Sequence, residues 1–177
     1  MRAIRNRKPK AAEIIQGLSR EAQGLVEVLQ NWHPTPGSAF PGHDFHGVSQ
    51  DRADVAGVLA GIKPAALIDA QDLSPEIQDM ISRGIYDPVG ADPLIEEMIA
   101  VGKSHGYVYE EFVDFVTGEP QGAFGKQRNV KALRGLYTAV ATLEDWQAPA
   151  VHVRVGRLLG YPERNIREFV MQDLAGW

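Results

Sequence analysis

The chain of 177 residues contains no cysteine, and this absence restricts the chemistry open to the protein. Without thiols there are no disulfides, iron–sulfur clusters, thiolate zinc sites or cysteine nucleophiles. Any metal ion must therefore be bound by histidine, aspartate or glutamate side chains.

Long apolar runs and familiar catalytic motifs are absent as well. No stretch approaches the ~18 apolar residues of a membrane-spanning helix. The charged start at residues 1–10 is not followed by the apolar run of a secretory signal. We therefore expect no membrane association and a cytoplasmic location. No phosphate-binding loop of Walker spacing and no Gly-x-Ser-x-Gly elbow occurs, so the sequence leaves open whether the protein is an enzyme.

Composition and periodicity predict the fold class. Apolar residues make up 44% of the chain and charged residues 23%, as in ordinary globular proteins. The length suits one well-buried core. Helical periods dominate, and the few strand segments give no sustained β-α alternation. We expect an α+β, mostly helical fold in a single compact domain over residues 11–177, preceded by a basic arm at residues 1–10.

Charge is distributed unevenly along the chain. The net charge of −5 divides into +3 over residues 1–40, −11 over 41–119 and +3 over 120–177. Basic ends of this kind attract nucleic acid or another polyanion, unless they pair with the acidic middle or simply face water. The candidate nucleic-acid contacts in the two basic clusters are Arg5, Arg7, Lys8, Lys126, Arg128 and Lys131.

Apolar spacing and cap residues predict the helices before residue 107. A helix is expected over 11–32, which Gly17 and Ser19 would divide in two. Ser49 is a plausible N-cap for a helix over 50–62. Two further helices are expected to begin at Pro75 and at Pro93.

Strands and later helices follow from similar signals. Residues 65–69 read as a short buried strand. Residues 107–117 read as a second strand that returns from Ala123 after a turn, although the spacing of Val108, Phe112 and Val116 also fits a helix. A long helix is expected from an Asn129 cap to Asp145, with further helices over 149–159 and from Pro162 to about residue 174.

Residues 155–170 carry the spacing of a helix-turn-helix. A small residue, Gly156, lies four positions before the turn residue Gly160, and the aliphatic Ile166 follows six positions after it. The pair at 150–174 resembles that family, which implies DNA binding, commonly as a homodimer, with the second helix in the major groove. The implied contacts to bases or phosphates are Glu163, Arg164, Asn165, Arg167 and Glu168. The alternative is a purely structural helical corner.

The same segment carries a second resemblance. Residues 158–162, Leu-Leu-Gly-Tyr-Pro, resemble a segment of small uncharacterised bacterial and phage-type proteins in which cysteines often follow the proline. Arg164 and Asn165 follow it here, so any thiol-based role is lost. This resemblance brings no activity with it and is compatible with an orphan interaction protein.

Histidines cluster in the proline- and glycine-rich loop at 33–48. His33, His43, Asp44 and His46 lie within fourteen residues of one another. His43, Asp44 and His46 are the candidate ligands of a divalent metal ion, given one further ligand, or the parts of a general base. The spacing matches no zinc motif, and an ordinary loop is the alternative. His105 and His152 are isolated, and His105 has the position of a structural residue at a helix C-terminus.

The hypothesis that these patterns favour is a non-enzymatic binding or regulatory protein. It would recognise nucleic acid or a protein partner through its basic ends and the C-terminal helix pair. One alternative is a small metal- or histidine-dependent enzyme that uses the 33–46 loop. The other is an orphan phage-type interaction protein.

Overall fold

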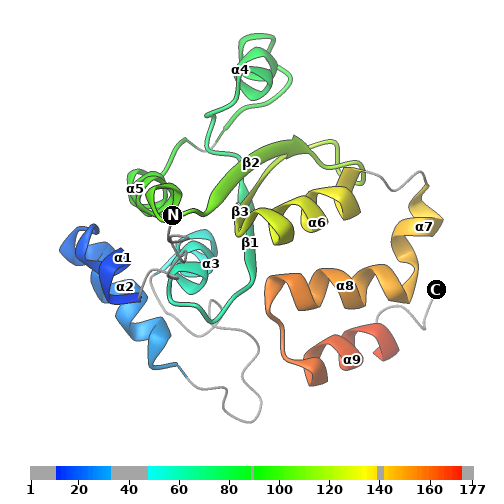
Figure 1. Ribbon diagram of the computed structural model, residues 1–177. Helices are drawn as coiled ribbons and strands as arrows, with labels where there is room; N and C mark the ends of the chain where they lie inside the picture. The colour runs from blue at the N-terminus through cyan, green and yellow to red at the C-terminus, as the bar shows by residue number, and fades with distance from the viewer. Residues whose placement is uncertain (1–10, 33–47, 89, 139–141, 173–177) are drawn as a thin grey trace, which may run out of the picture.

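The computed structural model describes residues 11–32, 48–88, 90–138 and 142–172, and shows an α+β fold (Figure 1). Within those ranges the chain forms nine helices and one three-stranded antiparallel sheet. The predicted fold class is therefore confirmed. No helix of the described ranges is long and apolar enough to cross a bilayer.

The elements begin and end close to the local signals in the sequence. The predicted division of 11–32 is confirmed, and the Ser19 hydroxyl accepts a hydrogen bond from the N–H of Ala22. Ser49, Ser74 and Asp92 cap the next three long helices in the same way. The elements are α1 (Ala11–Gln16), α2 (Arg20–Gln30), α3 (Gln50–Leu59), β1 (Ala65–Asp69), α4 (Pro75–Ser82), α5 (Pro93–Ser104), β2 (Val108–Val113), β3 (Pro120–Gly125), α6 (Gln127–Thr138), α7 (Leu143–Gln147), α8 (Pro149–Leu159) and α9 (Glu163–Gln172).

The predicted long helix from Asn129 to Asp145 is wrong. The helix α6 begins earlier, at Gln127, and ends at Thr138. Thr142 has an extended backbone and caps α7 by accepting a hydrogen bond from the N–H of Asp145. This capping signal outweighs the apolar periodicity on which the prediction rested. Asn129 lies inside α6, and its side-chain amide donates to the carbonyl of Pro64 at 3.0 Å.

The second strand is shorter than predicted, because a turn begins at Asp114. The Asp114 carboxylate accepts the N–H of Val116 at 2.8 Å, and its carbonyl accepts the N–H of Gly118 at 2.8 Å. The return strand accordingly starts at Pro120, three residues before the predicted start. The strands pair in the order β1-β3-β2, so β3 is the central strand.

The sheet separates two layers of helices (Figure 1). Ala66, Ile68 and Phe124 face a core shared with α1, α2, α3 and α5, which form the first layer. Ala123 and Phe112 face the opposite core, shared with α6 and α8 of the second layer. Because side chains alternate along a strand, one short sheet serves both cores.

The helix α4 projects away from the body of the molecule (Figure 1). Its base is held by Glu111, whose carboxylate accepts the N–H groups of Gln71, Leu73 and Ser74 at 3.1, 3.1 and 2.9 Å. The side-chain carbonyl of Gln71 accepts the N–H of Asp92 at 3.0 Å. Hydrogen bonds to a carboxylate are charge-assisted, so this base is a firm attachment.

The first layer contains a buried ion pair. The side chains of Lys63 and Asp54 are hydrogen-bonded, and both residues are 5% exposed. Burial lowers the pKa of Lys63, although Asp54 acts in the opposite direction. On the surface of the same layer, Arg52 contacts Asp92 at 2.6 Å and Glu21 at 3.6 Å.

Candidate nucleic-acid interface

The helix α6 has an apolar inner face and a basic outer face. Arg128, Lys131 and Arg134 recur at every third position and are exposed, and the exposed Lys126 precedes them. No acidic residue occurs between 126 and 138. The buried residues that attach the helix to the sheet are Val130, Leu133, Leu136 and Tyr137. Every charged side chain on the outer face of α6 is therefore positive.

The helices α8 and α9 form the close corner that the glycine spacing predicts. Gly160 ends α8 in the left-handed conformation, with φ 79° and ψ 22°, which favours glycine. Gly156 lies against α9, because a Cβ at this position would be 2.8 Å from Cγ1 of Ile166. The turn expected at Gly160 is confirmed, and Gly156 is the small residue that lets α9 approach α8 closely.

The corner is fixed to the body of the molecule at its turn. A Cβ at Gly160 would lie 3.1 Å from Cδ of Pro64, in the connection between α3 and β1. The N–H of Tyr161 donates to the carbonyl of Gly156 at 2.9 Å and closes the turn. Because α8 also contacts α6 and β1, these helices form one continuous layer.

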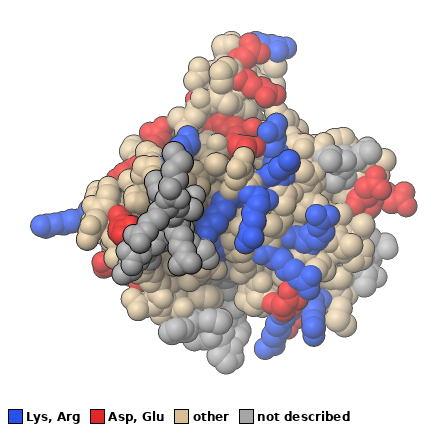
Figure 2. Space-filling view, in the orientation of Figure 1, with Lys and Arg blue, Asp and Glu red and all other residues tan. Residues whose placement is uncertain are grey.

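Basic side chains from three helices gather on one side of the molecule. Figure 2 shows Lys and Arg side chains over α6, α8 and α9, and acidic side chains over α4. The exposed basic residues of these segments, here called the basic face, are Lys126, Arg128, Lys131, Arg134, Arg154, Arg157, Arg164 and Arg167. The basic residues of 126–134 and those of 154–167 therefore lie on one surface.

Three members of the basic face, Arg134, Arg154 and Arg157, were missing from the contacts predicted above. The signal that identifies them is a common spacing of three residues, at 128/131/134, 154/157 and 164/167. On a helix, positions three apart share a face. The predicted contacts Arg5, Arg7 and Lys8 lie outside the described residues.

Ion pairs occupy only part of the basic face. Arg134 pairs with Glu110 at 3.1 Å, Arg157 with Glu163 at 2.6 Å, and Arg164 with Glu168 at 2.8 Å. The hydrogen bond from Arg157 lowers the pKa of Glu163. The remaining members, which form no ion pair within the described part of the chain, are Lys126, Arg128, Lys131, Arg154 and Arg167.

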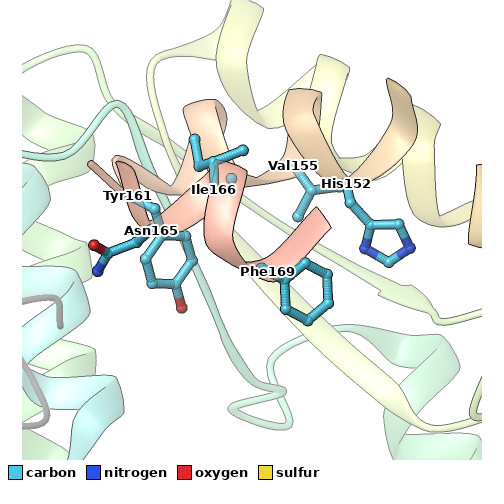
Figure 3. A pocket seen from close by; sticks show the side chains of 7 residues that line it. His152, Val155, Tyr161, Asn165, Ile166 and Phe169 are labelled. Carbon is cyan, nitrogen blue, oxygen red and sulfur yellow. The ribbon is translucent and has the colours of Figure 1, made fainter. Parts of the chain in front are cut away.

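A groove of about 340 Å³ lies between α8 and α9 (Figure 3). Tyr161 and Asn165 lie at one end and His152 and Phe169 at the other. The described residues that line it, and that define the α8–α9 groove, are His152, Val155, Gly156, Tyr161, Asn165, Ile166 and Phe169. Asn165, a predicted nucleic-acid contact, thus lines a groove instead of standing free on the surface.

His152, which is isolated in the sequence, belongs to a row of aromatic rings. Its ring centroid lies 5.3 Å from Trp146 and 5.4 Å from Phe169. Trp146 is 4.7 Å from Tyr137, which is 6.0 Å from Phe112 of β2. Burial raises the pKa of Tyr137. The row connects the sheet to α9 and holds His152 at the edge of the groove.

The predicted metal site falls on residues that the structure does not describe. His33, His43, Asp44 and His46 all lie in the range 33–47. Among the described residues, no three His, Asp or Glu side chains are grouped to hold a metal ion. His105 is the C-cap of α5, and its Nδ1 lies 2.9 Å from the carbonyl oxygen of Val101. This is the position that the sequence predicted for it.

Acidic residues line a separate cavity of about 320 Å³ in the first layer. Asp51, Asp69 and Asp92 contribute to its wall. Burial, together with the nearby carboxylates, raises the pKa of Asp51 to about 6, although the N–H of Asp69 donates to it. The acidic and basic surfaces therefore belong to different layers.

Comparison with known proteins found no matching family model, no matching curated protein and no matching solved structure. Both resemblances noted in the sequence therefore stay predictions. Evidence for a function comes from the geometry and charge of the basic face.

Proposed function

We propose that the protein is a non-enzymatic binding protein that recognises nucleic acid by contacting the phosphate backbone with its basic face. The observation that carries this proposal is the gathering of eight exposed cations on one layer, five of them without an ion pair in the described residues. A chain of net charge −5 repels a polyanion on average. Binding therefore requires that positive charge be concentrated on one side, as it is here.

The dimensions of the basic face suit a duplex. Packed helices lie about 8–10 Å apart, so the rows on α6, α8 and α9 together span roughly 20 Å. The major groove of B-DNA is about 12 Å wide, which places phosphates of both strands within reach of such a surface. Exposed lysine and arginine side chains can then replace the condensed counterions of the duplex.

The helix α9 contributes less charge than α6 and α8. Its two arginines are offset in net charge by Glu163, which pairs with Arg157 of α8, and by Glu168, which pairs with Arg164, whereas α6 and α8 carry no acidic residue. Surface ion pairs of this kind are weak and are easily exchanged for a ligand. The charge layout therefore favours binding through phosphates, with little preference for base sequence.

The salt dependence of binding to duplex DNA tests the proposal. Fluorescence anisotropy of a labelled duplex is measured at about 50 and 200 mM salt. If four or five phosphates are neutralised, affinity is expected to fall by about 100- to 500-fold between these conditions. Absence of binding at the lower salt would exclude the proposed function.

A pair of triple variants locates the contact surface. Lys126→Gln/Lys131→Gln/Arg154→Gln removes three cations that form no ion pair in the described structure. It is expected to reduce the slope of log affinity against log salt by about 2 to 3. The matched control, Arg20→Gln/Arg83→Gln/Lys103→Gln, removes three exposed cations from elsewhere. Equal losses in both variants would contradict a localised face.

A further inference from the structure

The helix α4 and the residues beside it form an acidic projection. The α4 projection, defined here as residues 72–87, has four acidic residues and one basic residue, a net charge of −3. These residues are Asp72, Glu76, Asp79, Asp87 and Arg83. Arg83 pairs with Asp79 at 3.2 Å. It leaves the exposed Glu76 and Asp87 without an ion pair among the described residues. The projection is therefore complementary in charge to the basic face.

Both of these surfaces also expose large apolar side chains. Leu73 and Ile85 flank α4 and are 44% and 56% exposed. On α9, Phe169 is 43% exposed and Met171 is 73% exposed. Removal of such groups from water is favourable, so a contact between the two surfaces would gain from apolar burial as well as from charge.

One chain cannot bring its own two surfaces together. The helices α4 and α9 lie at opposite ends of the molecule (Figure 1). The base of the projection is fixed by the carboxylate of Glu111, which accepts three backbone N–H groups. The projection stands clear of the helices of both layers (Figure 1), so it can reach a neighbouring molecule. Every further copy of the chain supplies the complementary surface.

We propose that the α4 projection docks on the basic face of a second copy of this chain. The eight residues of α4 are about 12 Å long, which fits within the roughly 20 Å span of the basic face. The contact is head-to-tail, because different surfaces of the two copies meet. A contact of this size buries less than about 1,200 Å² in total, as transient complexes do. It is measured without nucleic acid and does not depend on the proposed function.

Sedimentation velocity at two salt concentrations tests the proposal. At about 20 mM salt the average mass should rise above the 19.4 kDa of one chain, with half of the chains associated at about 10–100 μM. At about 300 mM salt it should return toward that of one chain, because salt screens exposed charges. A monomer up to about 200 μM at the lower salt would overturn the proposal and leave the projection to a different partner. Association that does not weaken with salt would also overturn it.

Matched charge reversals locate one side of the contact. Glu76→Lys/Asp87→Lys reverses two exposed charges of the α4 projection and should weaken association by at least about tenfold. The control Glu13→Lys/Glu27→Lys changes the net charge equally at exposed positions of α1 and α2. It should associate at least as strongly as the unmodified protein. Equal losses in the two variants would count against docking through α4.

A mixture of two variants locates the other side and does not depend on how well α4 folds. The basic-face variant Lys126→Gln/Lys131→Gln/Arg154→Gln keeps its projection, whereas Glu76→Lys/Asp87→Lys keeps its basic face. Each variant alone should be largely monomeric at about 50 μM and low salt, whereas the mixture should form one-to-one dimers. Each dimer would join one intact projection to one intact basic face. A mixture that stays monomeric, or a basic-face variant that associates like the unmodified protein, would show that the second copy does not dock on the basic face.

Discussion

The two helical layers that flank the sheet differ in how their charged side chains are paired. In the first layer Lys63 is buried against Asp54, and Arg52 is held by Asp92. In the second layer the basic face points to solvent, and five of its eight members form no ion pair with described residues. Charges of the first layer serve the fold, whereas those of the second layer are available to a ligand.

This difference shows why the net charge says little about binding. The sheet keeps the two layers apart, so the acidic residues of the middle of the chain do not neutralise the basic face as a whole. Among the described acidic residues of that segment, only Glu110, at the edge strand β2, forms an ion pair with the basic face, through Arg134. Polyanion binding depends on the local concentration of cations, and the fold creates that concentration by packing α6 beside α8.

The strongest test of the first layer is the substitution Asp54→Asn. It removes the carboxylate partner of a buried ammonium group, which typically costs about 3–5 kcal/mol of stability. We expect the free energy of unfolding, measured by urea denaturation, to fall by that amount. The double variant Asp54→Leu/Lys63→Met replaces both charges with apolar groups and should recover most of the loss. A destabilisation below about 1 kcal/mol would show that the pair does not serve the fold.

A smaller effect is expected from alanine at two helical glycines of the second layer. A Cβ at Gly156 would meet Cγ1 of Ile166 at 2.8 Å, so Gly156→Ala should cost about 1–2 kcal/mol by forcing α8 and α9 apart. At Gly135 in α6 a Cβ would meet nothing within 4 Å. Gly135→Ala should therefore stabilise the protein by about 0.5–1 kcal/mol through helix propensity. If Gly156→Ala did not lower the midpoint of thermal unfolding, α8 and α9 would not be as closely packed as the contact with Ile166 indicates.

Two single charge reversals compare the basic face with a position elsewhere on the protein. Arg128→Glu places a negative charge on the basic face and should weaken duplex DNA binding by about tenfold, or ~1.4 kcal/mol. Arg83→Glu changes the charge of the protein equally, but at the end of α4. It should leave the affinity nearly unchanged. If both reversals weakened binding alike, net charge and not the basic face would control the interaction.

Local chemistry explains which parts of the fold were predictable from the sequence. Ser49, Ser74 and Asp92 cap helices through their own side chains, and Gly160 ends one through its backbone, so each signal acts within a few residues. The failed prediction concerned residues 129–145, where apolar spacing continues past a break that Thr142 enforces. The spacing of apolar residues does not reveal that a single capping residue interrupts a helix.

The candidate site was less predictable, because it depends on tertiary packing. The basic clusters around Lys131 and Arg164 are visible in the sequence, but nothing local places α6 beside α8. The groove at His152 lies at the end of a row of rings from five elements, which only the fold brings together. Sequence patterns therefore identified the parts of the basic face without showing that they share a surface.

The last prediction concerns Asp51, whose pKa of about 6 lies above its ordinary value of 3.8. Between these two values the folded protein binds more protons than the unfolded chain, so stability falls as pH rises through this window. At pH 7 the ionised carboxylate is therefore destabilising.

The variant Asp51→Asn removes this charge and keeps an acceptor for the N–H of Asp69, which bonds to Asp51 at 3.0 Å. We expect a gain of about 1 kcal/mol at pH 7, well below the full value of the shift, because the side chain is partly exposed and water screens it. The gain should vanish near pH 4, where Asp51 is already protonated in the folded protein. Urea denaturation at both pH values measures it. A gain that persists at the lower pH would come from packing and not from charge, and Asp51 would then be no exception to the rule that first-layer charges serve the fold.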